Sequence, residues 1–382
     1  MSPVEVNDRP DTRSSFARVT AIDPFTDPRW EAFVLRLPQA TIYHHPAWLQ
    51  VLQREYAQAG AFLACEDRDG SLLGIFPLLY TKGLPIGGGP LTAPRLSSLP
   101  RTPLAGPLAV DSAATVALLE EARNRVAQRR GMYLQIKASG GDLTGLAQGV
   151  VAKPWRFTYL LALPESSAAP FRISNSQNRA SIRRAINKAA ANGVQARLAE
   201  NEADVRAWYS LYLETMRRNV VPPRPLRLFL AMWQLLRPLG MMRLLLAEQV
   251  TPSGAKILGG CIYLLFGSTC TYAFGASGTE DLSLRPNDLV QWQAINDAVA
   301  EGYRVFDFGE VPEGDANLAR YKAKWGAEPV RLQRCYYPDI PDDDSGGDDE
   351  KPSRAHQLAS AVWRRLPLRL TAWTGDRLYA RL

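Results

Sequence analysis

The chain has few of the residues that bind metals or form disulfides. Its 382 residues include four cysteines and three histidines, and no two cysteines have the C-x-x-C spacing. We therefore expect no metal site, and we place the chain in the cytoplasm, where thiols stay reduced. The first 17 residues are polar and lack the apolar segment of a secretory signal. We expect them to form a disordered leader.

Charge is missing from one stretch that must be weighed as a membrane span. The stretch 257–279 carries no charge and is long enough to cross a bilayer. However, glycine, serine and threonine interrupt it, and most of its other residues are aromatic, β-branched or leucine. This composition favours a buried β-hairpin over a transmembrane helix.

Acidic residues are absent between Glu165 and Glu200, where six arginines and lysines occur. The formal net charge of the chain is +7, which favours an anionic partner. Arg179 and Arg183 lie one turn apart on the predicted helix 173–192, where they could hold a phosphate or carboxylate. Arg184 and Lys188 point elsewhere and suit solvent or a tRNA contact.

The remaining periodicity describes two similar halves. The first half has predicted helices at 28–37, 46–57 and 113–130, a hairpin at 61–80, an irregular loop at 82–107, and strands at 132–138 and 155–164. The second half has predicted helices at 173–192, 205–217, 225–236 and 287–301, and strands at 194–199, 242–250, 256–266, 271–276, 304–311 and 330–338.

Each half thus places helices first, then an antiparallel hairpin, then a helix and final strands. This is the element order of a GNAT fold. We expect an α/β (α+β) protein of two tandem GNAT-like domains, 18–164 and 165–339, with mixed, mostly antiparallel sheets flanked by helices. An acidic linker, 340–355, and a basic amphipathic tail, 356–382, follow. The tail either lies on an anionic membrane surface or packs on the domain.

Several polar residues of the second half are candidates for chemistry. Lys322 falls within the apolar stripe of the segment 316–326, so we expect it to be partly buried and either used on a substrate or snorkelling over Trp325. Asp307 and Glu310 lie on the strand 304–311 and could act as bases or form structural salt bridges.

The start of the helix 287–301 is a candidate anion site. Asn287 is a candidate cap, and free N–H groups at this end could bind a pyrophosphate. The glycine-rich loop typical of acetyl-CoA users is absent, and Arg285 could partly replace it.

Four segments of the second half resemble the FemABX-like peptidoglycan-bridge aminoacyltransferases and their relatives with a BioF2-like acetyltransferase domain. They read SQNRASIRRAINKAAANGV, LGGCIYLLFGSTCTYAFGAS, RPNDLVQWQAINDAVAEGYRVFDFGE and NLARYKAKWGAEPV. The resemblance implies that donor and acceptor meet in a cleft dominated by the second domain. It also implies that Lys322 helps to bind the acceptor and stabilise charge, with Arg179 or Arg183 assisting.

The predicted function is therefore transfer of an acyl or aminoacyl group to an amine of a cell-envelope or exopolysaccharide precursor, nucleotide-sugar or lipid-linked. No cofactor is expected to be bound. The donor substrate is either acyl-CoA or aminoacyl-tRNA. The long helical arm of the tRNA-using members of the family is not seen in this sequence, which counts against aminoacyl-tRNA. Two other classes stay open: an inactive module that binds an anionic precursor, and a tRNA-binding protein. The candidate substrate-binding residues are Arg179, Arg183, Tyr272, Arg285, Asn287 and Trp325.

Overall fold

A computed structural model describes residues 18–84, 92–138, 143, 145–165, 173–252, 254–340 and 354–382, with the backbone alone for 354–357. The leader 1–17 and most of the expected acidic linker lie outside the described residues.

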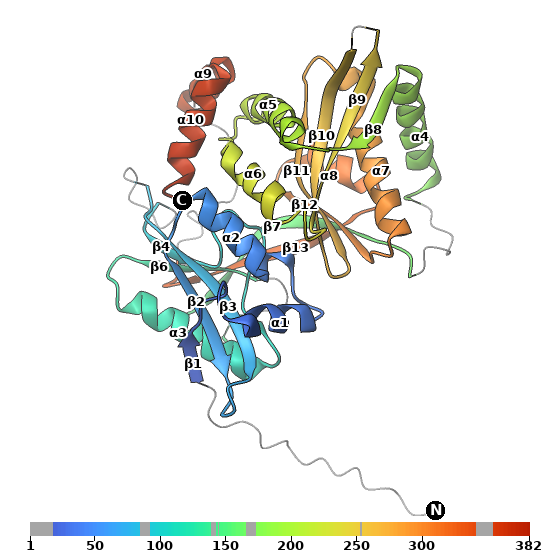
Figure 1. The fold of residues 1–382 in the computed structure, drawn as a ribbon. Coiled ribbons are helices and arrows are strands. Elements are labelled where there is room, and N and C mark those ends of the chain that lie inside the picture. The colour runs from blue at the N-terminus through green and yellow to red at the C-terminus, as the bar shows by residue number, and fades with distance from the viewer. Residues whose placement is uncertain are drawn as a thin grey trace, which may run out of the picture.

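The strands of the described residues form one sheet in the order β1-β2-β3-β4-β6-β13-β7-β12-β11-β10-β9-β8, with β5 beside β3 (Figure 1). Most neighbours are antiparallel; β4 with β6 and β11 with β12 are parallel. The bounds are β1 Arg18–Ala21, β2 Gly60–Glu66, β3 Leu72–Thr81, β4 Arg95–Ser97, β5 Leu108–Ala109, β6 Tyr133–Lys137, β7 Val151–Ala162, β8 Val194–Leu198, β9 Met242–Thr251, β10 Gly254–Phe266, β11 Thr269–Ser277, β12 Val305–Val311 and β13 Glu328–Tyr337.

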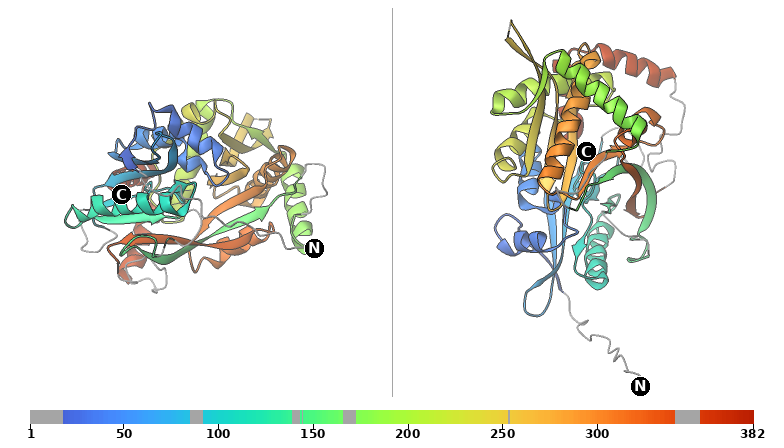
Figure 2. Two further views of the ribbon diagram at one scale, coloured as in Figure 1. Left: turned by 90° about the horizontal axis from the view of Figure 1, so that it is seen from below. Right: turned by 90° about the vertical axis from the view of Figure 1, so that its right-hand side faces the viewer.

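Helices cover both faces of this sheet. They are α1 Pro28–Arg36, α2 Pro46–Glu55, α3 Ser112–Ala127, α4 Ser176–Ala191, α5 Glu202–Arg218, α6 Leu226–Leu235, α7 Pro286–Ala300, α8 Ala316–Ala323, α9 Arg354–Arg365 and α10 Leu368–Tyr379, with short 3-10 turns at Ile42–His44 and Leu282–Leu284. The right-hand view in Figure 2 shows α4 and α7 on one face of β8–β11 and α5 and α6 on the other. The predicted mixed, mostly antiparallel fold flanked by helices is confirmed.

Local sequence explains where several helices begin. Asp27 accepts a hydrogen bond from the backbone N–H of Arg29, and Pro28 takes the first position of α1. His45 caps α2 in the same way through the N–H of Ala47. Two predictions were wrong. The expected loop 82–107 contains β4, and Arg285, rather than Asn287, precedes the first turn of α7.

The uncharged stretch 257–279 is a β-hairpin, as predicted. It forms β10 and β11, which pair antiparallel from Gly259 opposite Ser277 to Phe266 opposite Thr269. No helix among the described residues is long and apolar enough to cross a membrane.

Strands β7 and β13 join the two halves of the chain. β7 follows the first half but pairs with β12 of the second half, where Leu160 lies opposite Asp307. β13 pairs with β7 and then continues to β6, where Arg334 lies opposite Lys137. Each half therefore places its last strand beside strands of the other half. The sheet is continuous, and any cavity at this junction has walls from both halves.

A hydrophobic core also spans the junction. It includes Leu49 and Leu52 of α2 together with Phe229 and Met232 of α6, all at most 2% exposed. Burial of each such side chain contributes about 1.5–3 kcal/mol. The two halves consequently pack as one unit along this interface.

A buried ion pair reinforces this interface. Glu55 at the end of α2 accepts two hydrogen bonds from Arg224, at 2.7 Å from Nε and 2.6 Å from Nη2. Arg101 approaches the same carboxylate at 3.5 Å. The two guanidinium groups and one carboxylate are almost completely buried, and separating the halves would take Arg224 of the second half away from Glu55 of the first.

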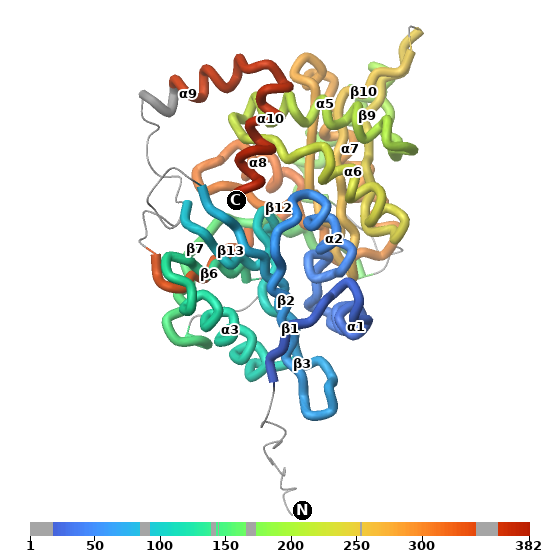
Figure 3. The backbone as a smooth tube through the Cα atoms, turned by 60° about the vertical axis from the view of Figure 1, so that its left-hand side comes forward, coloured from blue at the N-terminus to red at the C-terminus, as the bar shows by residue number. Residues whose placement is uncertain are grey.

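The basic tail forms the two helices α9 and α10 (Figure 3). α10 packs on the body of the protein, because Arg227 pairs with Asp376 and Tyr56 donates to the same carboxylate at 3.0 Å. The Tyr379 hydroxyl donates to the Pro222 carbonyl at 3.1 Å. In contrast, α9 exposes Leu358 and Val362, which are 69% and 61% accessible.

Candidate functional site

A cavity of about 750 Å³ lies at the junction of the two halves. Its walls come from β4 and β6 of the first half, from β7 and β13, and from β11, β12 and α8 of the second half. Tyr379 and Leu382 of the tail also line it. Because both halves contribute, the cavity exists only in the assembled fold.

The separation of β11 from β12 opens one side of this cavity. The two strands pair in parallel from Thr269 opposite Val305 to Thr271 opposite Asp307, and their pairing then ends. The residues that follow, 272–274 and 308–310, line the cavity. Backbone groups that would otherwise pair across the two strands instead take side-chain partners: the Gly309 N–H binds Asp307, and the Gly309 carbonyl binds Lys322.

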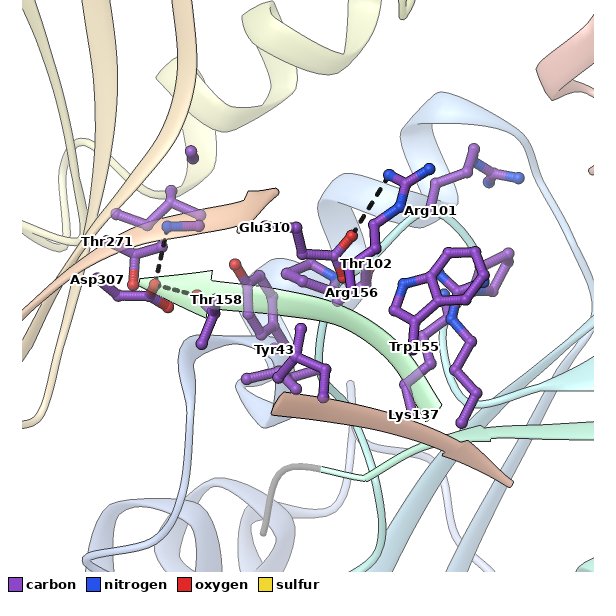
Figure 4. A pocket seen from close by; sticks show the side chains of 18 of the residues that line it. Tyr43, Arg101, Thr102, Lys137, Trp155, Arg156, Thr158, Thr271, Asp307 and Glu310 are labelled. Carbon is purple, nitrogen blue, oxygen red and sulfur yellow. Dashed lines mark hydrogen bonds and ion pairs between the residues drawn. The ribbon is translucent and has the colours of Figure 1, made fainter. Parts of the chain in front are cut away.

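Asp307 lies at the point of separation (Figure 4). Its Oδ1 accepts hydrogen bonds from Thr158 Oγ1 at 2.6 Å and from the Gly309 backbone N–H at 2.8 Å. Burial raises the pKa of Asp307, while these two hydrogen bonds and the nearby Lys322 oppose that rise. A carboxylate with a raised pKa in a cavity can accept a proton from a reacting group.

Lys322 is buried, as the helical periodicity predicted, with 4% of its surface exposed. Its Nζ donates to the carbonyl oxygens of Gly309 at 2.8 Å and Glu310 at 2.9 Å. Burial lowers the pKa of Lys322 to about 8, although Asp307 and Glu310 favour the charged form. Since an ammonium has three N–H groups, one is left to donate to a ligand in the cavity.

Gly309 makes this arrangement possible. Its φ of +75° lies in the left-handed region, and the pairing of β12 with β7 shifts register between Asp307 and Glu310. The irregularity lets the Gly309 N–H reach Asp307 while its carbonyl reaches Lys322. A residue with a Cβ would be strained in this conformation.

Glu310 faces the middle of the cavity. Its Oε2 lies 3.8 Å from Arg156 Nη1, and its buried Oε1 has no hydrogen-bond partner among the described residues. The salt bridge is therefore long, and one carboxylate oxygen is free for a ligand.

The other end of the cavity is cationic. Figure 4 shows Arg101, Trp155 and Lys137 on the side away from Asp307. Arg334 stacks on Trp155, with its guanidinium carbon 3.3 Å from the ring centroid. Our sequence reasoning missed these residues. A signal was available, because Gln135 and Lys137 alternate on one face of a strand that is otherwise apolar and buried.

The structure brings four of the predicted site residues together: Asp307, Glu310, Lys322 and Tyr272 all line the cavity. The other five lie elsewhere. Arg179 donates to the Ser174 carbonyl at 2.7 Å, and Arg183 is exposed on α4. Trp325 is fully buried in the core formed with β12, α4 and α7.

At the start of α7, where we expected an anion site, the carboxylate of Asp288 already lies in the first turn of the helix. Asn287 donates to Ser277 Oγ at 3.3 Å, and Arg285 is exposed. Asp288 in the first turn of α7 is buried and forms an ion pair with Lys324. A carboxylate at this position already interacts with the positive end of the helix dipole, which disfavours a second anion there.

The side chains that usually bind metal ions are not clustered in the described part of the chain. No group of three or more His, Cys, Asp or Glu residues there could hold a metal ion. The four cysteines are all buried, and none of them forms a disulfide.

Comparison with known proteins now adds to this geometry. Residues 176–323 match the family model described as an acetyltransferase (GNAT) domain. This range includes α4, the β9–β11 meander, α7, β12 and α8, and hence Asp307, Glu310 and Lys322. A search of curated proteins finds no match.

Several solved structures share the fold. The crystal structure of FemX is 17% identical, with a TM-score of 0.62, and the alignment covers 90% of this chain and 100% of FemX. A C-terminal domain (DUF2156) from Agrobacterium fabrum, assigned to a lysylphosphatidylglycerol synthetase, is 11% identical with a TM-score of 0.53, covering 83% of this chain and 93% of that one. A protein of unknown function from Bacteroides thetaiotaomicron is 11% identical with a TM-score of 0.53, covering 84% and 99%.

These matches confirm the resemblance predicted from the sequence. The similarity to FemX extends over both halves of the chain, and the family model identifies the part that carries the acidic and lysine residues of the cavity. Residues 176–323 thus match an acetyltransferase (GNAT) domain model, and they lie within a larger fold that is similar to that of FemX.

Proposed function

We propose that this protein transfers an acyl or aminoacyl group to a primary amine of a cell-envelope precursor. The observation that carries the proposal is that a carboxylate, Asp307, and a buried ammonium, Lys322, both line the junction cavity and each is held there by hydrogen bonds. The acetyltransferase (GNAT) domain match supports acyl transfer, and GNAT acyltransferases use acyl-CoA as co-substrate. The fold shared with FemX and with the synthetase domain supports an envelope acceptor.

The proposed reaction assigns one task to each charged group. The acceptor nitrogen attacks the carbonyl carbon of the donor, a C–N bond forms, and the C–S bond of a thioester or the C–O bond of an aminoacyl ester breaks. The free N–H of Lys322 donates to the carbonyl oxygen as negative charge develops on it. Asp307 takes the proton from the attacking nitrogen, and this proton then passes to the leaving thiolate or alkoxide.

Mass spectrometry of a reconstituted reaction tests the proposal. Purified protein is supplied with envelope precursors and with either acyl-CoA or aminoacyl-tRNA, and a mass increment on the precursor identifies the transferred group. We expect Lys322→Ala to lower turnover by about 10²–10³. Arg320→Ala, an exposed cation on the same helix, serves as the matched control and retains activity. Equal turnover by wild type and Lys322→Ala would disprove the proposed role of Lys322.

We further propose that the tail holds the protein at an anionic membrane surface. Leu358 and Val362 lie one turn apart on α9, and Leu370 and Trp373 lie three residues apart on α10, so each pair shares a helix face. All four are at least 49% exposed. Arginines at 364, 365, 369 and 377 accompany them, and each contributes about 1 kcal/mol near such a surface.

Sedimentation with phosphatidylglycerol–phosphatidylcholine vesicles tests this second proposal. We expect binding to weaken several-fold in the Leu370→Ser/Trp373→Ser double variant and to fall as salt rises. Leu35→Ser removes an equally exposed leucine from α1 and should leave binding unchanged. Undiminished vesicle binding by the double variant and by a second double variant, Leu358→Ser/Val362→Ser, would show that the tail is not the contact.

A further inference from the structure

A buried lysine and a half-buried arginine lie directly opposite each other in the sheet. The antiparallel register of β6 and β13 places Lys137 opposite Arg334. Like charges in this position are destabilising, because their side chains stand side by side. Lys137 is 3% exposed, so water screens the repulsion poorly.

Neither cation has a carboxylate partner among the described residues. Lys137 Nζ donates to the Leu99 carbonyl at 2.7 Å, which leaves two of its N–H groups. Arg334 is stacked on Trp155, and its buried Nε has no hydrogen-bond partner within the described chain. Donors are therefore available, and their positive charge is not neutralised.

The cavity as a whole has the same imbalance. Six of the residues lining it are cationic and two are acidic. The acidic ones, Asp307 and Glu310, lie toward the β12 side, and Arg101 is already engaged with Glu55. Burying cations without counter-charge is expensive, so this end of the cavity is built for an anion that arrives with a ligand.

We propose that Lys137 and Arg334 form a phosphate-binding site that holds the anionic end of the acceptor, with its amine directed toward Asp307 and Lys322. This inference rests on the proposed function for the identity of the ligand as acceptor. A diphosphate fits better than a carboxylate, because two adjacent cations require more than one negative charge. The guanidinium fork also matches the geometry of phosphate oxygens.

The arrangement of the cavity sets the orientation of the acceptor. In Figure 4, Lys137 and Trp155 lie at one end, Glu310 and Arg156 between, and Asp307 at the other end. A group bound by Lys137 and Arg334 extends past Glu310 to reach the reacting carboxylate. The free Oε1 of Glu310 is placed to accept a hydrogen bond from the middle of such a ligand.

Proton uptake should accompany binding at this site. Burial lowers the pKa of Lys137 well below its usual value, and Arg334, Arg101 and Arg95 lower it further, while Glu310 opposes them. A phosphate beside Lys137 favours the charged form of its side chain and raises this pKa, so affinity should increase as pH falls.

Isothermal titration calorimetry with inorganic pyrophosphate tests the inference without any turnover. We expect Lys137→Met and Arg334→Gln each to weaken binding by at least about tenfold. Titrations in two buffers of different ionisation enthalpy should show less proton uptake for Lys137→Met than for wild type. Arg183→Gln, which removes an exposed cation of α4, should bind like wild type.

Further measurements separate the sources of the phosphate and control for folding. A nucleoside diphosphate that binds more tightly than pyrophosphate indicates a nucleotide-linked acceptor, whereas a short prenyl diphosphate that does so indicates a lipid-linked one. Lys137→Met removes like-charge repulsion, so its melting temperature should equal or exceed that of wild type. Wild-type pyrophosphate affinity in both variants would overturn the inference, and transfer activity could still stand. Loss of transfer with pyrophosphate binding intact would instead refute the proposed function alone.

Discussion

The two ends of the junction cavity differ in how their charges are balanced. At the β12 end, a carboxylate and an ammonium lie near each other and both are held by backbone groups, Asp307 by the Gly309 N–H and Lys322 by two carbonyls. At the β6 end, Lys137 and Arg334 lie side by side without a carboxylate partner among the described residues. The balanced end keeps reactive groups fixed before substrate arrives, whereas the unbalanced end gains its counter-charge from a ligand.

The largest expected effect is at the balanced end. Asp307→Asn keeps the shape of the side chain but removes the proton acceptor, so turnover should fall by about 10²–10⁴. Pyrophosphate affinity should remain that of wild type, because the variant leaves Lys137 and Arg334 in place. Steady-state kinetics and calorimetry on the same preparation measure both quantities. Parallel loss of turnover and affinity would show that the two ends are not separate.

The second largest expected effect is a loss of stability when the buried cluster of Glu55, Arg101 and Arg224 is broken. Glu55→Gln leaves Arg224 and Arg101 without their carboxylate, and the free energy of unfolding should fall by about 3–5 kcal/mol. Urea denaturation measures the change. Glu313→Gln is the matched control, because its pair with Arg331 is exposed and worth at most about 1 kcal/mol. Similar losses in the two variants would contradict the role of burial.

A smaller effect is expected from the backbone that supports the balanced end. Gly309→Ala places a Cβ at a φ of +75° and should cost about 1–2 kcal/mol of stability. It should also lower turnover, because the Gly309 carbonyl holds Lys322. Gly302→Ala, at a φ of +80° in the turn after α7, should show a similar strain without loss of turnover. Full activity of Gly309→Ala would argue against backbone positioning of Lys322.

The smallest effect is a pH dependence near neutrality. The pKa of Lys322 is lowered to about 8, and the charged form is the one that stabilises the oxyanion. Turnover should therefore be halved near pH 8 and fall about tenfold for each further pH unit. In Lys322→Arg the side chain keeps its charge to much higher pH, so the turnover of this variant should not fall between pH 8 and pH 10. An unchanged fall in turnover in that variant would assign it to another group.

The sequence predicted much of the fold because the fold depends on local patterns. Asp27 before Pro28 marks the start of α1, and the hydrophobic periodicity of 316–326 placed Lys322 inside an apolar stripe. The loop 82–107 was only partly predicted, since β4 is three residues long and forms through pairing with β3 and β6. Such a short strand has no periodicity of its own.

The candidate site was predicted less completely. Asp307, Glu310, Lys322 and Tyr272 come from one half of the chain and from segments that resemble known families. Lys137 and Arg334 are almost 200 residues apart, and their proximity follows from the pairing of β13 with β6 across the junction. Arg179 and Arg183 had the stronger sequence pattern but lie on an outer helix, away from the cavity.

By itself, the sequence determined the helices, the central hairpins and the chemical type of the second-half candidates, because caps, periodicity and turn residues act over a few positions. The tertiary structure alone decided that β7 of the first half pairs with β12 of the second, and that β13 of the second half pairs with β6 of the first. It also decided that β11 and β12 separate after Asp307, and that Lys137 and Arg334 meet where no carboxylate of the described chain pairs with them. These features depend on strand pairing between distant segments, which no local pattern encodes.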